Sequence, residues 1–317
     1  MNRGGLEGPR VHRRPPAKVN LGLRLVGQRA DGYHLLESIF APVSLFDDLV
    51  VERLGVEGDV ELELSMSTDA DLPPALAAVT SGPDNLVVRA AEAFRQRAGI
   101  VEGLRISLEK RIPSGAGLGG GSSDAGAVLS ALEELFGTSS PAREEIFAAA
   151  LRLGADVPYF LAPRPALVQG IGERIEPLAG LPPFRLVVAN AGVSVATAEV
   201  YRIADALPGS LTDTGAGSTM RSFSRLRDQP GDWASTLGAL LVNDLEPAAT
   251  RLCPPIGRLL GQMRDAGALG AGLSGSGGTV FGVFSEASSA EEAAKFLRGD
   301  SAPGRDAAWV REAQVLC

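Results

Sequence analysis

The sequence is poor in cysteine and in histidine, and both shortages exclude classes of protein. Among its 317 residues there are two cysteines, Cys253 and Cys317, too few for a scaffold held together by disulfides. The two histidines are His12 and His34, so a zinc site built from histidine ligands is not expected. The content of 45% hydrophobic and 21% charged residues is instead typical of a globular enzyme.

Long apolar runs and excess positive charge are also lacking. No run approaches the roughly 18 apolar residues of a membrane span. The net charge of −8 argues against nucleic acid or an anionic membrane as a partner. The first residues, MNRGGLEGPRVHRRPP, are basic without an apolar core, so they are no secretory signal, and we interpret residues 1–15 as a disordered leader. These features predict a cytoplasmic protein and leave its oligomeric state open.

The most informative segment is rich in glycine and serine. Ile112–Ala127 reads IPSGAGLGGGSSDAGA, with six glycines and three serines. It follows a predicted strand, Leu104–Arg111, and precedes a predicted helix, Ala125–Phe136. A loop with so few side chains lets backbone N–H groups approach a ligand, and the helix N-terminus favours an anion. The segment therefore predicts a loop that binds a phosphate chain.

Other interpretations of this segment are weaker. Gly115, Gly117 and Gly120 match the G-x-G-x-x-G spacing of dinucleotide-binding proteins. However, the preceding strand ends in charged residues, and no acidic residue follows about 20 positions later at a strand end. No Gly-Lys-Ser/Thr closes a Walker A loop. A flexible linker would not lie between two well-patterned elements.

The hydrophobic pattern predicts two α+β domains, with a boundary around Pro177–Pro183. The expected strands are Lys18–Leu25, Leu35–Leu45, Leu49–Leu54, Val60–Met66, Leu104–Ile112, Ala166–Leu178, Arg185–Asn190, Thr279–Phe284 and Ala308–Val315. The expected helices are Leu86–Ala98, Ala125–Phe136, Pro141–Leu153 (capped by Ser140), Thr197–Leu207, Trp233–Leu241, Ile256–Ala266 and Ala290–Arg298. Leu211–Asp228 is expected to be a mobile loop, and Gly270–Gly278 a second glycine-rich turn.

Four further clusters complete the requirements of phosphoryl transfer to an alcohol. Lys18 and Asn20 share one face of the first strand, and Asp31–His34 forms a turn. Asp156 lies in an otherwise apolar segment, and residues 273–279 form the second glycine turn. Each residue taken singly is more simply explained as a surface or turn residue. Together they offer a cradle for phosphates, a carboxylate for the acceptor hydroxyl and a cation for developing charge.

These segments resemble a known superfamily. PSGAGLGGGSSDA is similar to the phosphate-binding motif of the GHMP kinases, and LSGSGGTVFGVF to their C-terminal glycine motif. PAKVNLGLRLVGQRADGYHLLESIF, LGADVPYFL and ALVQGIGE resemble one GHMP family more specifically. That family phosphorylates the 2-hydroxyl of a cytidine diphosphate-linked methylerythritol in the non-mevalonate isoprenoid pathway. The similarity runs in register from about Pro16 to Val315.

The resemblance implies roles for single residues. Asp156 corresponds to the catalytic aspartate that takes or orients the proton of the acceptor hydroxyl. Lys18 corresponds to its paired lysine, which keeps the carboxylate ionised and stabilises charge on the transferring phosphoryl group. The substrate residues that it implies are Asn20, Tyr33, His34, Thr197 and Tyr201. In this group His34 bonds the pyrimidine edge, while Tyr33 and Tyr201 pack on the cytosine.

The resemblance also implies ATP as the phosphate donor with Mg²⁺, whose ligands the sequence does not identify. The implied nucleotide-binding residues are Pro113, Ser114, Gly115, Ala116, Gly117, Leu118, Gly119, Gly120, Gly121, Ser122 and Ser123 around the triphosphate, with Asn85 and Lys110 at the adenine and ribose. The implied fold is the two-domain α+β GHMP kinase fold. Its N-terminal ATP-binding domain, resembling ribosomal protein S5 domain 2, spans residues 16–177, and its ferredoxin-like substrate domain spans 178–317.

Several competing functions share these features. A mevalonate or homoserine kinase would lack the Lys-x-Asn strand followed by Asp-Gly-Tyr-His, and a diphosphomevalonate decarboxylase would not need a cytidine-binding turn. A non-catalytic binding module of the same fold predicts loss of Lys18 or Asp156, and both are present. A nicotinamide oxidoreductase would bind NAD tightly, and the glycine spacing alone does not support this assignment.

Overall fold

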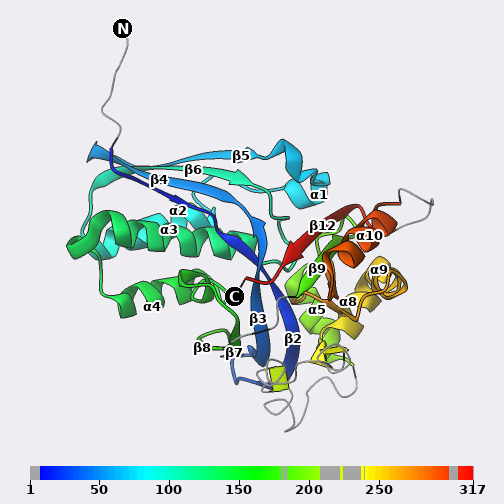
Figure 1. Cartoon of the computed structure of the whole chain (residues 1–317). Coiled ribbons are helices and arrows are strands. Elements are labelled where there is room, and N and C mark those ends of the chain that lie inside the picture. The colour runs from blue at the N-terminus through cyan, green and yellow to red at the C-terminus, as the bar shows by residue number, and fades with distance from the viewer. Residues whose placement is uncertain are drawn as a thin grey trace.

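The computed structural model describes residues 8–179, 181, 184–207, 222–223, 237–238, 240–299 and 306–316. Within these residues the strands form three four-stranded sheets (Figure 1). The first sheet has the order β1 (Arg10–Arg13), β4 (Asp48–Glu57), β6 (Glu102–Lys110) and β5 (Val60–Met66). The second has the order β2 (Pro16–Gln28), β3 (His34–Phe46), β7 (Ala166–Gly170) and β8 (Arg174–Pro177). The third has the order β10 (Gly270–Leu273), β11 (Thr279–Phe284), β9 (Arg185–Asn190) and β12 (Trp309–Gln314).

The helices cover one face of the first sheet and one face of the third (Figure 1). Against the first sheet lie α2 (Leu86–Ala98) and α3 (Gly120–Phe136), and α4 (Arg143–Leu153) packs against α2. Against the third lie α5 (Thr197–Asp205), α8 (Glu246–Leu252), α9 (Pro254–Asp265) and α10 (Ala287–Arg298). The remaining short helices are η1 (Thr68–Ala70), α1 (Pro74–Ala77), η2 (Gly137–Ser139) and η3 (Tyr159–Leu161). None of the described helices combines the length and apolarity needed to cross a bilayer.

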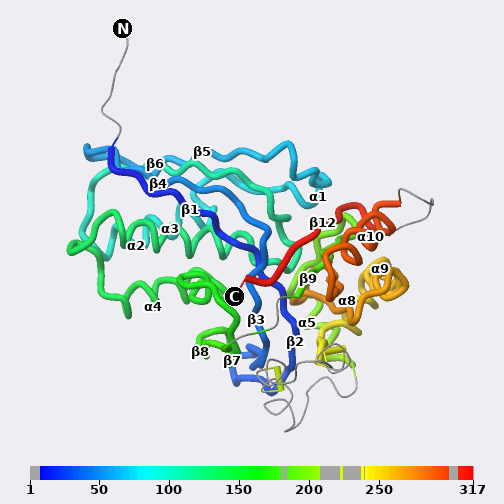
Figure 2. Tube along the Cα trace, viewed as in Figure 1, coloured from blue at the N-terminus to red at the C-terminus, as the bar shows by residue number. Residues whose placement is uncertain are grey.

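The long strand β2 links the halves of the molecule and positions two polar residues. Because side chains alternate along a strand, Val19 and Leu21 enter the core between the second and third sheets, while Lys18 and Asn20 face away from it. At Leu23, β2 also pairs with residues 242 and 244 through backbone hydrogen bonds. The last strand, β12, returns to the centre of the molecule beside β3 (Figure 2). Both halves of the chain therefore contribute to one core.

The structure corrects the expected leader. Arg10–Arg13 forms β1, which pairs antiparallel with β4, and Val11 is buried in the core of the first sheet. Arg13 forms an ion pair with Glu134, so this basic residue has a partner in the fold. Residues 1–7 lie outside the described residues.

Four element boundaries also differ from expectation. Gly270–Leu273, expected as part of a turn, forms β10, so the second glycine turn begins after Leu273. α3 begins at Gly120 rather than residue 125, and glycine suits this first position because a Cβ on Gly120 would lie 2.8 Å from Ile112 Cγ2. α4 begins after Ala142, whose N–H donates to the Glu145 carboxylate, and not at Pro141 with a Ser140 cap. Residues 166–178 form the β7–β8 hairpin rather than one strand, turning at Gly170 and Gly172, whose φ angles are +75° and +117°.

The other expected strands and the helices at Leu86–Ala98, Thr197–Leu207, Ile256–Ala266 and Ala290–Arg298 are confirmed within a few residues. The expected loop Leu211–Asp228 and the expected helix Trp233–Leu241 lie mostly outside the described residues.

Candidate active site

The glycine loop, residues 113–119, joins β6 to α3 and packs against a second glycine turn. Gly115, Gly117 and Gly119 have φ angles of +63°, +83° and +71°, which side chains rarely allow. A Cβ on Gly117 would lie 2.2 Å from the carbonyl oxygen of Ser274 in the turn between β10 and β11. The glycines therefore provide both the left-handed backbone and the close contact.

The second turn is fixed by two polar side chains. Ser274 Oγ donates to the Gly117 carbonyl at 2.9 Å, which ties the two turns together. Asn243 Nδ2 donates to the carbonyls of Leu273 and Gly275 at 2.8 and 2.7 Å, and its Oδ1 accepts from Leu245 N. With its hydrogen bonds satisfied, this buried asparagine holds the turn against the glycine loop.

Two cavities flank the glycine loop and share Gly117 and Gly119 as lining residues. The smaller, of about 420 Å³, is lined by the loop, the start of α3, Asn85 and Lys110. The larger, of about 740 Å³, is lined by Lys18, Asn20, Tyr33, His34, Phe40, Asp156, Thr197 and Tyr201, among others. The geometry thus places one cavity for a ligand on each side of one backbone loop.

Lys18 and Asp156 face each other in the larger cavity. Lys18 Nζ lies 3.5 Å from Asp156 Oδ2, and the two side chains are 5% and 31% exposed. The ammonium also donates to Asn20 Oδ1 at 2.6 Å and lies 4.7 Å from the centre of the Phe40 ring. Lys18 is therefore held by three groups, while the Asp156 carboxylate stays accessible from the cavity.

Asn20 is held in turn by β3. Its Nδ2 donates to Ser38 Oγ at 2.8 Å, and that hydroxyl donates to the Gly22 carbonyl at 2.6 Å. This buried chain fixes the amide so that its oxygen faces Lys18. The structure therefore brings together Lys18, Asn20 and Asp156, as the sequence predicts.

Two tyrosines lie near Asp156. Burial, and to a lesser degree the Asp156 charge, raises the pKa of Tyr201 to about 12. The same causes raise the pKa of Tyr159 well above its ordinary value. Both phenols thus remain protonated at neutral pH, which leaves the carboxylate as the better proton acceptor.

The expected cytidine-binding residues Tyr33, His34 and Tyr201 line the same larger cavity. His34 Nε2 lies 2.7 Å from Asp205 Oδ1, and the His34 ring centre is 4.8 Å from that of Tyr201. Tyr33 is 64% exposed in the turn between β2 and β3. Thr197 Oγ1 is 2.9 Å from Ser276 Oγ. Asp205 lies in no motif of the sequence, whereas Ser276 lies in the second glycine motif but carries no expected role there.

The expected nucleotide residues are only partly brought together. Ser123 and Leu118 do not line the smaller cavity, whereas the other residues of the loop do. Ser123 Oγ donates to the Pro16 carbonyl at 2.7 Å, and Leu118 is fully buried with its carbonyl accepting from Lys18 N. The Ser123 hydroxyl and the Leu118 backbone carbonyl thus tie this segment to β2, and the expected nucleotide contacts of these two residues stay predictions.

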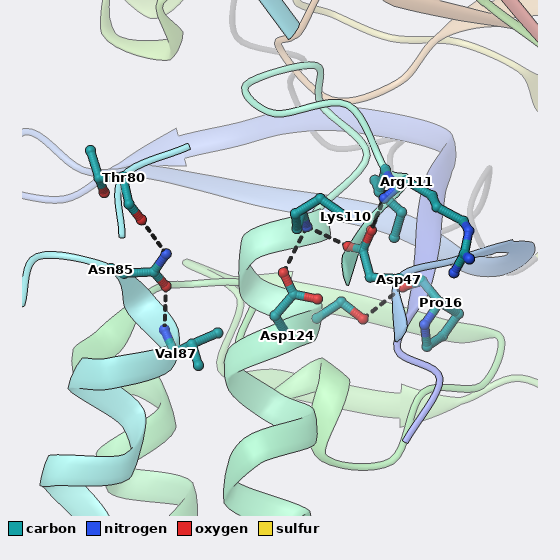
Figure 3. A network of polar contacts seen from close by, with 10 residues as sticks. Pro16, Asp47, Thr80, Asn85, Val87, Lys110, Arg111 and Asp124 are labelled. Atoms are coloured by element: carbon teal, nitrogen blue, oxygen red, sulfur yellow. Dashed lines mark hydrogen bonds and ion pairs between the residues drawn. The ribbon is translucent and has the colours of Figure 1, made fainter. Parts of the chain in front are cut away.

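Asn85 and Lys110 line the smaller cavity, but their polar atoms already have partners (Figure 3). Asn85 caps α2 by accepting from Val87 N at 2.9 Å, and it donates to the Thr80 carbonyl. The Lys110 ammonium lies between the carboxylates of Asp47 and Asp124. The sequence did not reveal these partners. Asp124 is nevertheless an unusual residue among the glycines, serines and alanines at the start of α3.

Comparison with known proteins agrees with this geometry. Residues 85–163 match the N-terminal domain of GHMP kinases, and residues 226–301 match their C-terminal domain. The 4-diphosphocytidyl-2-C-methyl-D-erythritol kinase of Syntrophotalea carbinolica is 39% identical over 90% of this chain and 94% of its own length. The enzyme of that name from Thermus thermophilus is 42% identical over 91% and 93%.

Solved structures give the same result. A crystal structure of a 4-(cytidine 5'-diphospho)-2C-methyl-D-erythritol kinase matches with a TM-score of 0.72 and 39% identity, covering 97% of this chain and 100% of the other. An L. major mevalonate kinase is similar with a TM-score of 0.67, covering 98% of each chain. Its 20% identity reflects a shared fold alone.

Proposed function

The chain belongs to the 4-diphosphocytidyl-2-C-methyl-D-erythritol kinases, a family of the GHMP kinases, and we propose that it transfers the γ-phosphate of ATP to the 2-hydroxyl of 4-diphosphocytidyl-2-C-methyl-D-erythritol. The products are the 2-phosphate and ADP. This reaction belongs to the non-mevalonate isoprenoid pathway. Both domains of the GHMP kinases and most of the relatives' length are present.

One observation carries the proposal: the Lys18–Asp156 pair lies in the larger cavity, whose wall at Gly117 and Gly119 also bounds the smaller one. Phosphoryl transfer needs donor and acceptor in line, with a proton acceptor near the attacking hydroxyl and positive charge near the phosphoryl group. ATP in the smaller cavity would direct its γ-phosphate over the loop toward this pair. The acceptor alcohol would then lie between Asp156 and the phosphorus.

In this arrangement we assign Asp156 to accept the hydroxyl proton as the oxygen attacks phosphorus and ADP leaves. Lys18 stabilises the charge on the transferring group. Asn20 holds Lys18 and contacts the substrate. His34, Tyr33 and Tyr201 receive the cytosine, because they supply a hydrogen-bonding ring and two aromatic faces in the wall of the larger cavity.

We propose that Mg²⁺ enters bound to ATP. Among the described residues no group of three or more histidine, cysteine or acidic side chains gathers as a metal site. This donor set fits a magnesium ion held mainly by phosphates and water, with few protein ligands. When bound, the ion neutralises phosphate charge. Ser122 and the glycine loop line the smaller cavity, where those phosphates would bind.

We further propose that the boundary between the ATP-binding and substrate domains lies at residues 177–178, where β8 ends and the chain crosses to β9 in the third sheet. The use of ATP supports the cytoplasm as the compartment.

An ADP-release assay with ATP and Mg²⁺ tests the function. We expect turnover with 4-diphosphocytidyl-2-C-methyl-D-erythritol and none with mevalonate or homoserine, because only the first has a cytidine for His34 in the larger cavity. Turnover with another alcohol would keep the kinase mechanism but overturn the substrate assignment. Absence of turnover with all three, despite ATP binding, would favour a decarboxylase or a non-catalytic protein.

A further inference from the structure

A buried cluster of three charged residues lies under the glycine loop (Figure 3). Lys110 Nζ donates to Asp124 Oδ2 at 2.7 Å and to Asp47 Oδ2 at short distance. The side chains of Lys110, Asp124 and Asp47 are 3%, 2% and 0% exposed. Two of them, Lys110 and Asp124, also line the smaller cavity. The cluster is therefore part of the floor beneath the proposed nucleotide.

The cluster joins the two ends of the glycine loop. At the loop entrance, Asp47 Oδ1 accepts from the backbone N–H groups of Arg111 and Ile112 at 2.5 and 2.8 Å. After the loop, Asp124 lies in the first turns of α3, and a Cβ on Gly120 would lie 3.3 Å from Lys110 Nζ. Lys110 thus connects the strand end before the loop to the helix after it.

The charges of the cluster do not balance if both carboxylates are ionised. One ammonium then faces two buried anions, and a buried net charge is costly. Asp47 accepts three N–H donors, so both of its carboxylate oxygens already serve as acceptors. Asp124 accepts only from Lys110, and its buried Oδ1 receives no hydrogen bond from any described residue. The proton of the cluster therefore belongs on Asp124.

Burial and the neighbouring Asp47 charge, only partly offset by Lys110, raise the pKa of Asp124 from 3.8 to about 8. The charged groups that face it are Lys110 from β6, Asp47 from the segment between β3 and β4, and Asp84 on the cavity wall before α2. Burial lowers the pKa of Lys110, but the neighbouring Asp124 and Asp47 outweigh it and raise the pKa above its ordinary value, so Lys110 stays charged throughout this range.

We propose that Asp47, Lys110 and Asp124 form a positioning unit for the glycine loop in which Asp124 is a neutral carboxylic acid. The unit fixes both ends of the loop and presents no net negative charge to the phosphates of the nucleotide. This inference rests on the proposed function in one respect: it takes a nucleoside triphosphate as the ligand of the smaller cavity. Lys110 then acts through the loop rather than by donating to the nucleotide.

The two carboxylates allow a matched test. In Asp124→Asn, the amide oxygen still accepts from Lys110, and the neutral amide NH2 replaces the O–H of the acid. We therefore expect this variant to preserve nucleotide affinity at neutral pH. Asp47→Asn replaces an acceptor of three N–H groups with an amide that has one oxygen, and we expect the affinity to fall roughly tenfold. The measurement is calorimetric binding of a non-hydrolysable ATP analogue with Mg²⁺, at temperatures where melting curves show both variants folded.

The pH dependence gives a second readout that does not require Asp47→Asn to fold. When the pH rises from about 7 to about 9, the natural protein should lose up to about tenfold in affinity as Asp124 ionises, and Asp124→Asn should not show this loss. Ionisation of the analogue is common to both proteins and cancels in the comparison.

Two results would overturn the proposal. One is a loss of affinity at neutral pH in Asp124→Asn as large as that in Asp47→Asn. The other is the same alkaline loss in Asp124→Asn as in the natural protein. Because binding is measured without the acceptor alcohol, these outcomes are independent of whether the cytidylyl substrate is turned over.

Discussion

The two lysine–aspartate clusters beside the glycine loop differ in how completely the protein encloses their charges. Around Lys110, both carboxylates are buried and one of them binds backbone N–H groups. Around Lys18, the Asp156 side chain is 31% exposed and lies 3.5 Å from the ammonium. The carboxylates of the Lys110 cluster are enclosed by the protein, whereas Asp156 can meet a substrate.

The same residue types therefore serve different purposes according to burial. In an enclosed cluster, removing one member leaves a buried charge without its partner, which is costly. Such a cluster therefore stabilises the backbone that it holds, here the glycine loop that a ligand must contact. A half-open pair can exchange a proton with a bound alcohol. The predictions below test this division, first through effects on catalysis and ligand binding in decreasing order and then through stability.

Asp156→Asn should lower kcat by about 10² to 10⁴-fold, because the amide cannot accept the proton of the attacking hydroxyl. The dissociation constant of the nucleotide should change little, since the nucleotide occupies the other cavity. Steady-state kinetics and calorimetry measure the two quantities. Turnover near that of the natural protein would remove Asp156 from the mechanism.

Gly117→Ala should destabilise the fold by about 1 to 3 kcal/mol and weaken ATP binding. Its φ of +83° is strained for alanine, and the new Cβ would lie 2.2 Å from the Ser274 carbonyl. Gly261→Ala in α9 is the matched control, because a Cβ at that position would meet none of the described residues within 4 Å. Thermal melting compares the two, and equal melting temperatures would refute the close contact between the glycine turns.

His34→Ala should raise the KM for the cytidylyl substrate roughly tenfold, through lost hydrogen bonding and lost packing on Tyr201. The KM for ATP should stay the same. Initial-rate kinetics with each substrate varied in turn separate these effects. A change confined to the KM for ATP would mean that the two ligands are assigned to the wrong cavities.

The last prediction concerns how stability depends on pH. Because the pKa of Asp124 is raised to about 8 from 3.8, its contribution to the free energy of unfolding is fully present below about pH 4 and is lost as the pH rises to about 8. Denaturant unfolding should show the natural protein losing stability relative to Asp124→Asn across this window. A constant difference between the two proteins would indicate that Asp124 is ionised throughout.

Sequence reasoning found the parts of the site whose composition is unusual. The glycine loop is recognisable because a run of glycines between a strand and a helix has few purposes. The spacing of Lys18 and Asn20 predicts that they share one face of a strand, and both lie in β2. The start of α3 was missed because glycine and serine disfavour helix, whereas here close packing against Ile112 requires glycine at position 120.

The rest depends on contacts between distant residues. Asp47 is 63 residues from Lys110, so the sequence could place Lys110 near a nucleotide but could not show that its ammonium is already bound. β1 was missed for a similar reason, because its basic residues find partners such as Glu134 only in the folded chain. Local pattern predicts elements and candidate residues, while the pairing of charges is decided by the tertiary structure.

The most direct test of the division between the enclosed Lys110 cluster and the half-open Lys18–Asp156 pair compares Asp156→Asn with Asp47→Asn. Single-turnover experiments at saturating ATP measure the rate, and calorimetry measures nucleotide binding. We expect Asp156→Asn to lower the rate of phosphoryl transfer and to leave nucleotide affinity unchanged. We expect Asp47→Asn to lower nucleotide affinity and to retain most of the rate. If Asp47→Asn instead lost the rate as far as Asp156→Asn with its affinity unchanged, the Lys110 cluster would take part in the chemistry and the division would be contradicted.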